Sequence, residues 1–208
     1  MQMLDDLARG AFLGEVETQS IYALNALHRF RRSLEEFKAV SGQVTQARFE
    51  LACEVFRDAH SALTHAGCLS RLLWPLPGKT AAHVRAHARA EEIRGLLDLE
   101  QPHAAVLGQR DLRNHLEHYD ERLDGWAVAP PPRHYVHDVI EPFRRIWGSD
   151  DRDIMRWYDP TTDVYRFQGE EFELARLEAA LGHALDRAQK ALASYDPARA
   201  LFGPRSAG

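Results

Sequence analysis

The chain has 208 residues, which is enough for one domain with a substantial hydrophobic core. Its 45% hydrophobic and 27% charged content is that of a globular protein and argues against an intrinsically disordered chain. The formal net charge of −5 gives no overall attraction for nucleic acid, so RNA or DNA binding would need a local basic patch. Among the 26 basic residues only Lys38, Lys79 and Lys190 are lysines, an arginine excess typical either of phosphate recognition or of a coding bias.

The sequence contains no apolar run of the length that crosses a bilayer, and its first ten residues lack the apolar centre of a signal peptide. We therefore expect no membrane association and a cytoplasmic location. Cys53 and Cys68 lie within helical apolar patterns, at a spacing that matches no metal or redox motif. This spacing predicts buried free thiols in a reducing compartment.

Apolar residues at intervals of three and four predict a series of amphipathic helices. The first two would form an antiparallel hairpin, since Thr45 is a suitable start for the second helix and Pro75 a suitable stop. Gly125 is expected to end the fourth helix. The predicted helices span about residues 15–40, 45–74, from 80 or 81 to before Pro102, 107–123 and 170–194.

A different pattern precedes the last helix. Residues 154–158 and 164–168 are rich in β-branched and aromatic side chains, and the turn-forming residues 159–163 separate them, which predicts a β-hairpin. Acidic residues from Glu170 onward suit the start of the final helix. The predicted fold is therefore all-α: an antiparallel helical bundle with a small β-hairpin addition near 153–168. We expect one domain over 1–208, with the hairpin inserted at about 150–169 and a loose tail from about 197.

Polar side chains gather on the fourth predicted helix, over residues 110–119. Asn114 and His118 are four positions apart and therefore share one helix face. Arg113 lies five positions before His118, and its long stem would let the guanidinium approach a phosphate held beside the imidazole. Arg113 and Glu117 also have the spacing of an ordinary i, i+4 ion pair, so the same residues are compatible with a purely structural role.

Arg113, four intervening residues and His118, with a polar Asn114 directly after the arginine, resemble the Arg-x4–6-His motif of the HEPN superfamily. Members of that superfamily are small helical bundles, often dimeric, and many are metal-independent ribonucleases of toxin and defence systems. The resemblance covers the motif helix alone. One toxin subgroup carries a tyrosine two positions after the histidine, whereas here Tyr119 follows His118 immediately and Asp120 holds that position. This difference weakens assignment to that subgroup.

The resemblance implies RNA as substrate, a homodimer, an antitoxin protein as a candidate partner, and neither a metal nor another cofactor. A histidine that titrates near neutral pH can take a proton from the RNA 2′-hydroxyl or give one to the leaving oxygen. An arginine can neutralise the charge that develops around phosphorus. The implied catalytic residues are Arg113, Asn114 and His118, and the candidate substrate-binding residues are Arg110, His115 and Tyr119.

Two alternatives remain open at the level of sequence. The chain could be a non-catalytic helical module that binds RNA or protein. It could also be a metal-dependent hydrolase, because His83 and His87 are four apart on a helix and other histidines could complete a metal site. Interleaved arginines make a solvated helix face the better interpretation of that stretch, and an RNA-binding strip of Arg85, Arg89 and Arg94 the weaker one.

Overall fold

A computed structural model describes residues 4–40, 45–109, 111, 119–131, 133–144, 150 and 153–195. Within these ranges the protein is mostly helical and carries a small four-stranded sheet. The predicted C-terminal tail lies outside the described residues. In the part of the chain that is described, no helix is long and apolar enough to cross a membrane. The helices are α1 (Asp6–Ala39), α2 (Gln46–Leu73), α3 (Ala81–Leu97), α4 (His103–Leu107), α6 (Tyr119–Ala127) and α7 (Leu174–Leu192).

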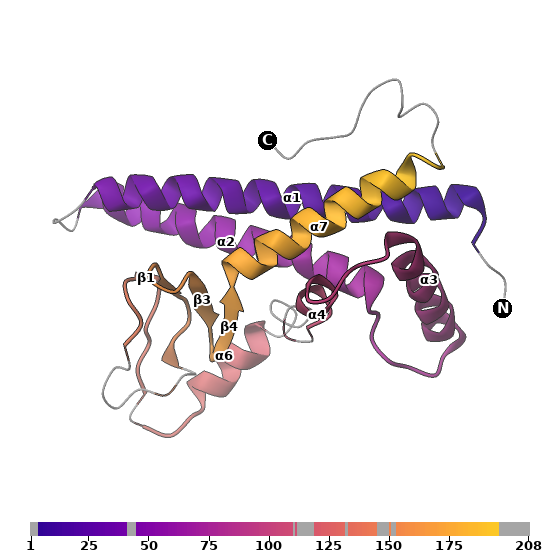
Figure 1. The fold of residues 1–208 in the computed structure, drawn as a ribbon. Helices are drawn as coiled ribbons and strands as arrows, with labels where there is room; N and C mark the ends of the chain where they lie inside the picture. The colour runs from indigo at the N-terminus through magenta and orange to yellow at the C-terminus, as the bar shows by residue number, and fades with distance from the viewer. Residues whose placement is uncertain are drawn as a thin grey trace.

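The two longest helices, α1 and α2, lie side by side, and α7 crosses α1 (Figure 1). The prediction for α2 is confirmed, because the Thr45 hydroxyl caps its first turn by accepting a hydrogen bond from the Arg48 N–H. The predicted start of α1 near Glu15 is wrong. The Asp5 carboxylate accepts from the Ala8 N–H at 2.8 Å, so the helix begins at Asp6, and its buried stripe extends back to Leu13.

Arginines of α3 bind the end of α2. Arg89 donates to the carbonyl oxygen of Leu72 at 2.9 Å, and Arg94 donates to that of Leu73. These carbonyls belong to the last turn of α2, where they have no partner within the helix. The expectation of a uniformly solvated arginine face is therefore wrong for these two residues, although Arg85 is exposed.

The sheet is larger than the predicted hairpin. Its strands are β1 (Val139–Ile140), β2 (Trp157–Asp159), β3 (Val164–Phe167) and β4 (Glu170–Glu173), and they lie in the order β1-β2-β3-β4. The β2–β3 hairpin is confirmed as an antiparallel pair, and β1 adds to it in parallel.

The predicted start of the last helix at Glu170 is wrong, because Glu170–Glu173 forms β4. Gln168 and Gly169 have φ angles of 46° and 85°, which lets them make a two-residue turn. That turn places Glu170 opposite Phe167, and α7 begins only at Leu174.

Large aromatic side chains of the β2–β3 hairpin are buried, and Tyr158, Tyr165 and Phe167 pack into the same core as the helices. Trp157, Tyr158, Tyr165 and Phe167 are all at most 2% exposed. The Phe30 ring of α1 meets the Tyr158 ring edge-on, with 4.9 Å between their centres. These side chains are core residues and are unavailable for stacking on nucleic-acid bases.

Three further expectations need correction. Gly125 does not end its helix, because α6 continues to Ala127. Leu107 is the last residue of α4 and not the first of a longer helix. Cys53 and Cys68 are free thiols but are exposed, since both lie away from the buried stripe of α2 that includes Phe56.

Candidate functional site

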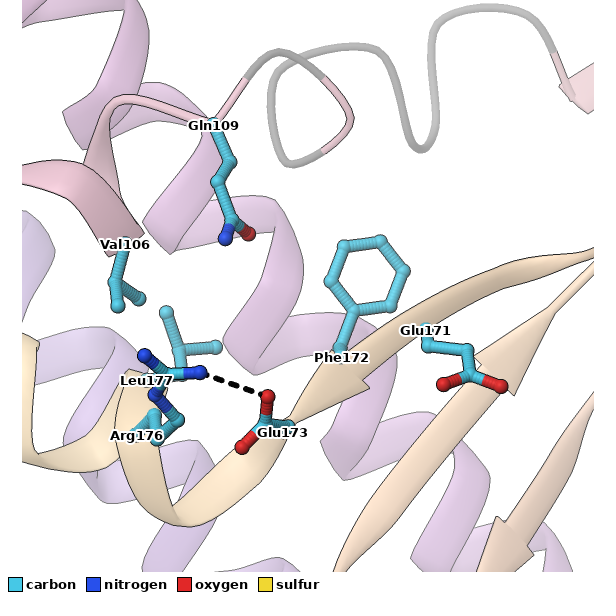
Figure 2. A pocket seen from close by; sticks show the side chains of 7 residues that line it. All are labelled: Val106, Gln109, Glu171, Phe172, Glu173, Arg176 and Leu177. Atoms are coloured by element: carbon cyan, nitrogen blue, oxygen red, sulfur yellow. Dashed lines mark hydrogen bonds and ion pairs between the residues drawn. The ribbon is translucent and has the colours of Figure 1, made fainter.

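A pocket of about 80 Å³ opens where α4 meets the junction of β4 and α7 (Figure 2). Its walls come from two stretches of sequence that are far apart, one at the end of α4 and the other running from β4 into α7. Figure 2 shows the amide of Gln109 and the ring of Phe172 turned toward the same space. The lining residues are Val106, Gln109, Glu171, Phe172, Glu173, Arg176 and Leu177.

The apolar part of the pocket is firmly built. Phe172 is 6% exposed and lies directly opposite Tyr165 in the β3–β4 register. Leu177 is 3% exposed and belongs to the buried stripe of α7. Val106 comes from the short helix α4, which packs against α7. Because each residue is held by its own element, the pocket has a fixed apolar floor.

The rim of the pocket is polar and electrically balanced. Glu171 accepts a hydrogen bond from Arg166 of β3 at 2.9 Å, and Glu173 accepts one from Arg176 of α7 at the same distance. Arg166 and Glu171 face each other directly in the sheet register. Each of the two carboxylates that line the pocket therefore has an arginine beside it.

A third pair ties the sheet to α6. Arg122 of α6 forms an ion pair with Glu170 of β4, and only 24% and 20% of the two side chains are exposed. The three glutamates of β4 thus bind arginines from three different elements, α6, β3 and α7. These pairs link β4 to all three elements and leave the surroundings of the pocket close to neutral.

The predicted catalytic residues Arg113, Asn114 and His118 lie outside the described residues, as do Arg110 and His115. Tyr119 is the first residue of α6, but its side chain is also outside the description. The flanks of the segment are described on both sides. Gln109 lines the pocket before it, and Arg122 binds β4 after it. Both flanks of the motif segment therefore contact the same region of the fold, around β4.

The histidines proposed as metal ligands have other partners. The Nδ1 atom of His83 lies 2.6 Å from the hydroxyl of Thr80, and the Nε2 atom of His87 lies 3.1 Å from the carbonyl oxygen of Leu76. Among the residues that the structure describes, no group of three or more His, Cys, Asp or Glu side chains could hold a metal ion. The helix α3 offers no support for a metal-dependent hydrolase.

Another polar cluster lies at the sheet edge near β1. The His137 imidazole is 3.0 Å from the Asp138 carboxylate, which also pairs with Arg156. Burial lowers the pKa of His137, and the Asp138 charge offsets that effect only in part. The imidazole is therefore mostly neutral at pH 7, and Arg156 and Asp138 neutralise each other. The cluster braces the loop before β1 and leaves no unpaired charge for a ligand.

No protein-family model, curated protein or solved structure matches this chain. The pocket residues were missed at the level of sequence, because the acidic run from Glu170 also suits a helix start. The one local signal was the Gln168-Gly169 pair, which is typical of a tight turn between strands.

Proposed function

We propose that this chain is a HEPN-like, metal-independent ribonuclease in which Arg113, Asn114 and His118 carry out the chemistry. The observation that carries the proposal is the Arg-x4-His spacing, with Asn114 beside the arginine, in the stretch of sequence between α4 and α6. Further support comes from the described residues on either side of that stretch. Its two flanks, at Gln109 and Arg122, both contact the region around the pocket and β4.

The proposed reaction needs no group beyond the side chains and the RNA itself. One imidazole takes the proton of a 2′-hydroxyl, and the 2′-oxygen forms a bond to the adjacent phosphorus. The bond from phosphorus to the 5′-oxygen breaks, and an imidazolium gives that oxygen its proton. Arg113 neutralises the charge on the phosphoryl oxygens, and Asn114 orients the imidazole or binds the substrate. The products are a 2′,3′-cyclic phosphate and a 5′-hydroxyl.

The proposal includes an antiparallel bundle of the long helices and a cytoplasmic homodimer in which the two copies of His118 face one shared cleft. One copy then acts as base and the other as acid. A toxin or defence role with an antitoxin partner belongs to the same proposal. Light scattering of the purified protein gives the oligomeric state, and a monomer that cuts RNA would refute the two-histidine scheme.

The decisive experiment is RNA cleavage in the presence of EDTA, with the product ends analysed. Wild-type protein should release 2′,3′-cyclic phosphate ends, and His118→Ala should abolish cleavage. Arg113→Ala should lower the rate by a factor of about 100 or more, the scale of one lost charge-stabilising group. The control is His28→Ala, because His28 is an exposed histidine of α1. Cleavage that survives His118→Ala would sink the assignment, and RNA binding without cleavage would favour the non-catalytic module.

A further inference from the structure

We propose that the pocket between α4 and the β4–α7 junction binds a single nucleobase, with guanine as the preferred base. The inference rests on the proposed RNA-directed function only for the choice of ligand class. Its physical basis is the composition of the pocket, an apolar floor from Val106, Phe172 and Leu177 beneath a rim of hydrogen-bonding groups.

The size and charge of the pocket favour a base over a phosphate. The pocket is small, at about 80 Å³, which favours a single flat ring system over a bulkier ligand. The carboxylates on the rim, Glu171 and Glu173, would repel a phosphate, which could use only the arginine of each ion pair and not the carboxylate. A neutral ligand with a flat apolar face avoids this repulsion. It would also cover the small part of the Phe172 side chain that is accessible, since that side chain is 6% exposed.

The rim groups match the hydrogen-bonding edge of guanine. The Glu173 carboxylate and the Arg176 guanidinium lie side by side, joined at 2.9 Å (Figure 2). Guanine presents two donors, N1–H and N2–H, next to the acceptor O6. A carboxylate can accept both donors together, and an arginine can donate to O6 and N7. The other bases offer a carboxylate fewer neighbouring donors.

The rim groups are free to turn toward a ligand. The side chains of Glu173 and Arg176 are 56% and 57% exposed, and an exposed ion pair contributes little net stability. The amide of Gln109 adds one donor and one acceptor from the opposite wall. Gln109 also directly precedes the segment that carries the RNA-cleavage motif, so a base held here would lie next to that segment along the chain.

The test measures binding of the four nucleoside 3′-monophosphates to the full chain by calorimetry, with inorganic phosphate as a separate ligand. Guanosine 3′-monophosphate should bind at least about tenfold more tightly than the other three, the scale of one additional charge-assisted hydrogen bond. Glu173→Gln should remove this preference. The matched control is Asp186→Asn, since Asp186 is another half-exposed acid of α7 and pairs with Lys190 away from the pocket.

Several results would overturn the proposal. These are equal binding of all four nucleotides, binding of inorganic phosphate as tight as that of the guanine nucleotide, and no binding of any nucleotide. A preference for the cationic probe arginine amide would likewise overturn it, by assigning the pocket to a basic side chain of a protein partner. The two proposals fail separately. If the protein cuts RNA but shows no base preference, only the proposal for the pocket is refuted. If it binds guanine but does not cut RNA, only the ribonuclease proposal is refuted.

Discussion

Replacing Arg31 with methionine should destabilise the protein, because Arg31 joins α1 to the sheet. Its guanidinium donates to both carboxylate oxygens of Asp163, at 2.7 Å for the Nη2–Oδ2 contact. The Tyr158 hydroxyl donates to the same carboxylate at 2.7 Å. Only 33% of the Arg31 side chain and 26% of the Asp163 side chain are exposed. The substitution would leave a largely buried carboxylate with only neutral donors, the Tyr158 hydroxyl and the Ala175 backbone N–H.

The magnitude follows from this partial burial. Removing one partner of a fully buried ion pair costs about 3–5 kcal/mol, and exposed pairs contribute roughly 0–1 kcal/mol. A pair about one-third exposed lies between these limits, so we expect a loss of about 2 kcal/mol. For a chain of this length that corresponds to a fall in Tm of about 4–8 °C.

Urea denaturation followed by circular dichroism measures the change, and α1 supplies its own control. The neighbouring Arg32 is 65% exposed and lies 4.0 Å from Glu36, so Arg32→Met should change stability by less than about 0.5 kcal/mol. Combining Arg31→Met with Asp163→Asn should recover part of the loss, because the unpaired charge is removed. Equal effects of the two arginine substitutions would refute the argument from burial.

Further predictions concern pH, capping, packing and the thiols. Burial alone would raise the pKa of Asp163, but hydrogen bonds from Arg31 and Tyr158 hold that pKa below its ordinary value. This carboxylate therefore contributes stability above its unfolded-state pKa of about 4 that is lost as the pH falls below it. Asp163→Asn should make urea midpoints less sensitive to pH below about pH 4. Thr45→Ala should cost about 1 kcal/mol by removing the α2 cap, and Leu27→Ala about 2–5 kcal/mol at a fully buried site. Both cysteines should react with a thiol reagent in the folded protein, and reaction only after unfolding would contradict their exposure.

The helices were predictable where the local signals were strong and pointed one way. Thr45 can cap a helix and Pro75 cannot continue one, so both limits of α2 follow from sequence. The start of α7 was not predictable from charge alone. Glutamates at Glu170 and Glu171 favour a helix start, but the preceding Gln168-Gly169 turn brings them onto β3 as a strand. Pairing with β3 makes this stretch a strand, and that pairing cannot be seen in the local sequence pattern of a helix start.

The pocket could not be predicted because its residues become neighbours only through the fold. Val106 and Leu177 are far apart in the chain, and they line the same pocket only because α4 packs against α7. The charge balance of the rim is hidden in the same way. Arg166 and Glu171 neutralise each other only because the strand register places them opposite one another. A shift of the strand register by one residue would have moved one of them to the other face of the sheet.

The sheet is joined to α6, and α6 directly follows the proposed active segment in the sequence. The sheet should therefore matter more to that segment than a peripheral insertion would. Of the three arginine–glutamate pairs on β4, the Arg122–Glu170 pair is the least exposed, so it should be the strongest. It is also the pair that joins β4 to α6. Since α6 begins where the motif segment ends, loosening this pair should weaken the positioning of that segment. Glu173 is exposed, and its loss should change which base is bound while leaving that position intact. Anchoring and base recognition would then depend on different glutamates of the same strand.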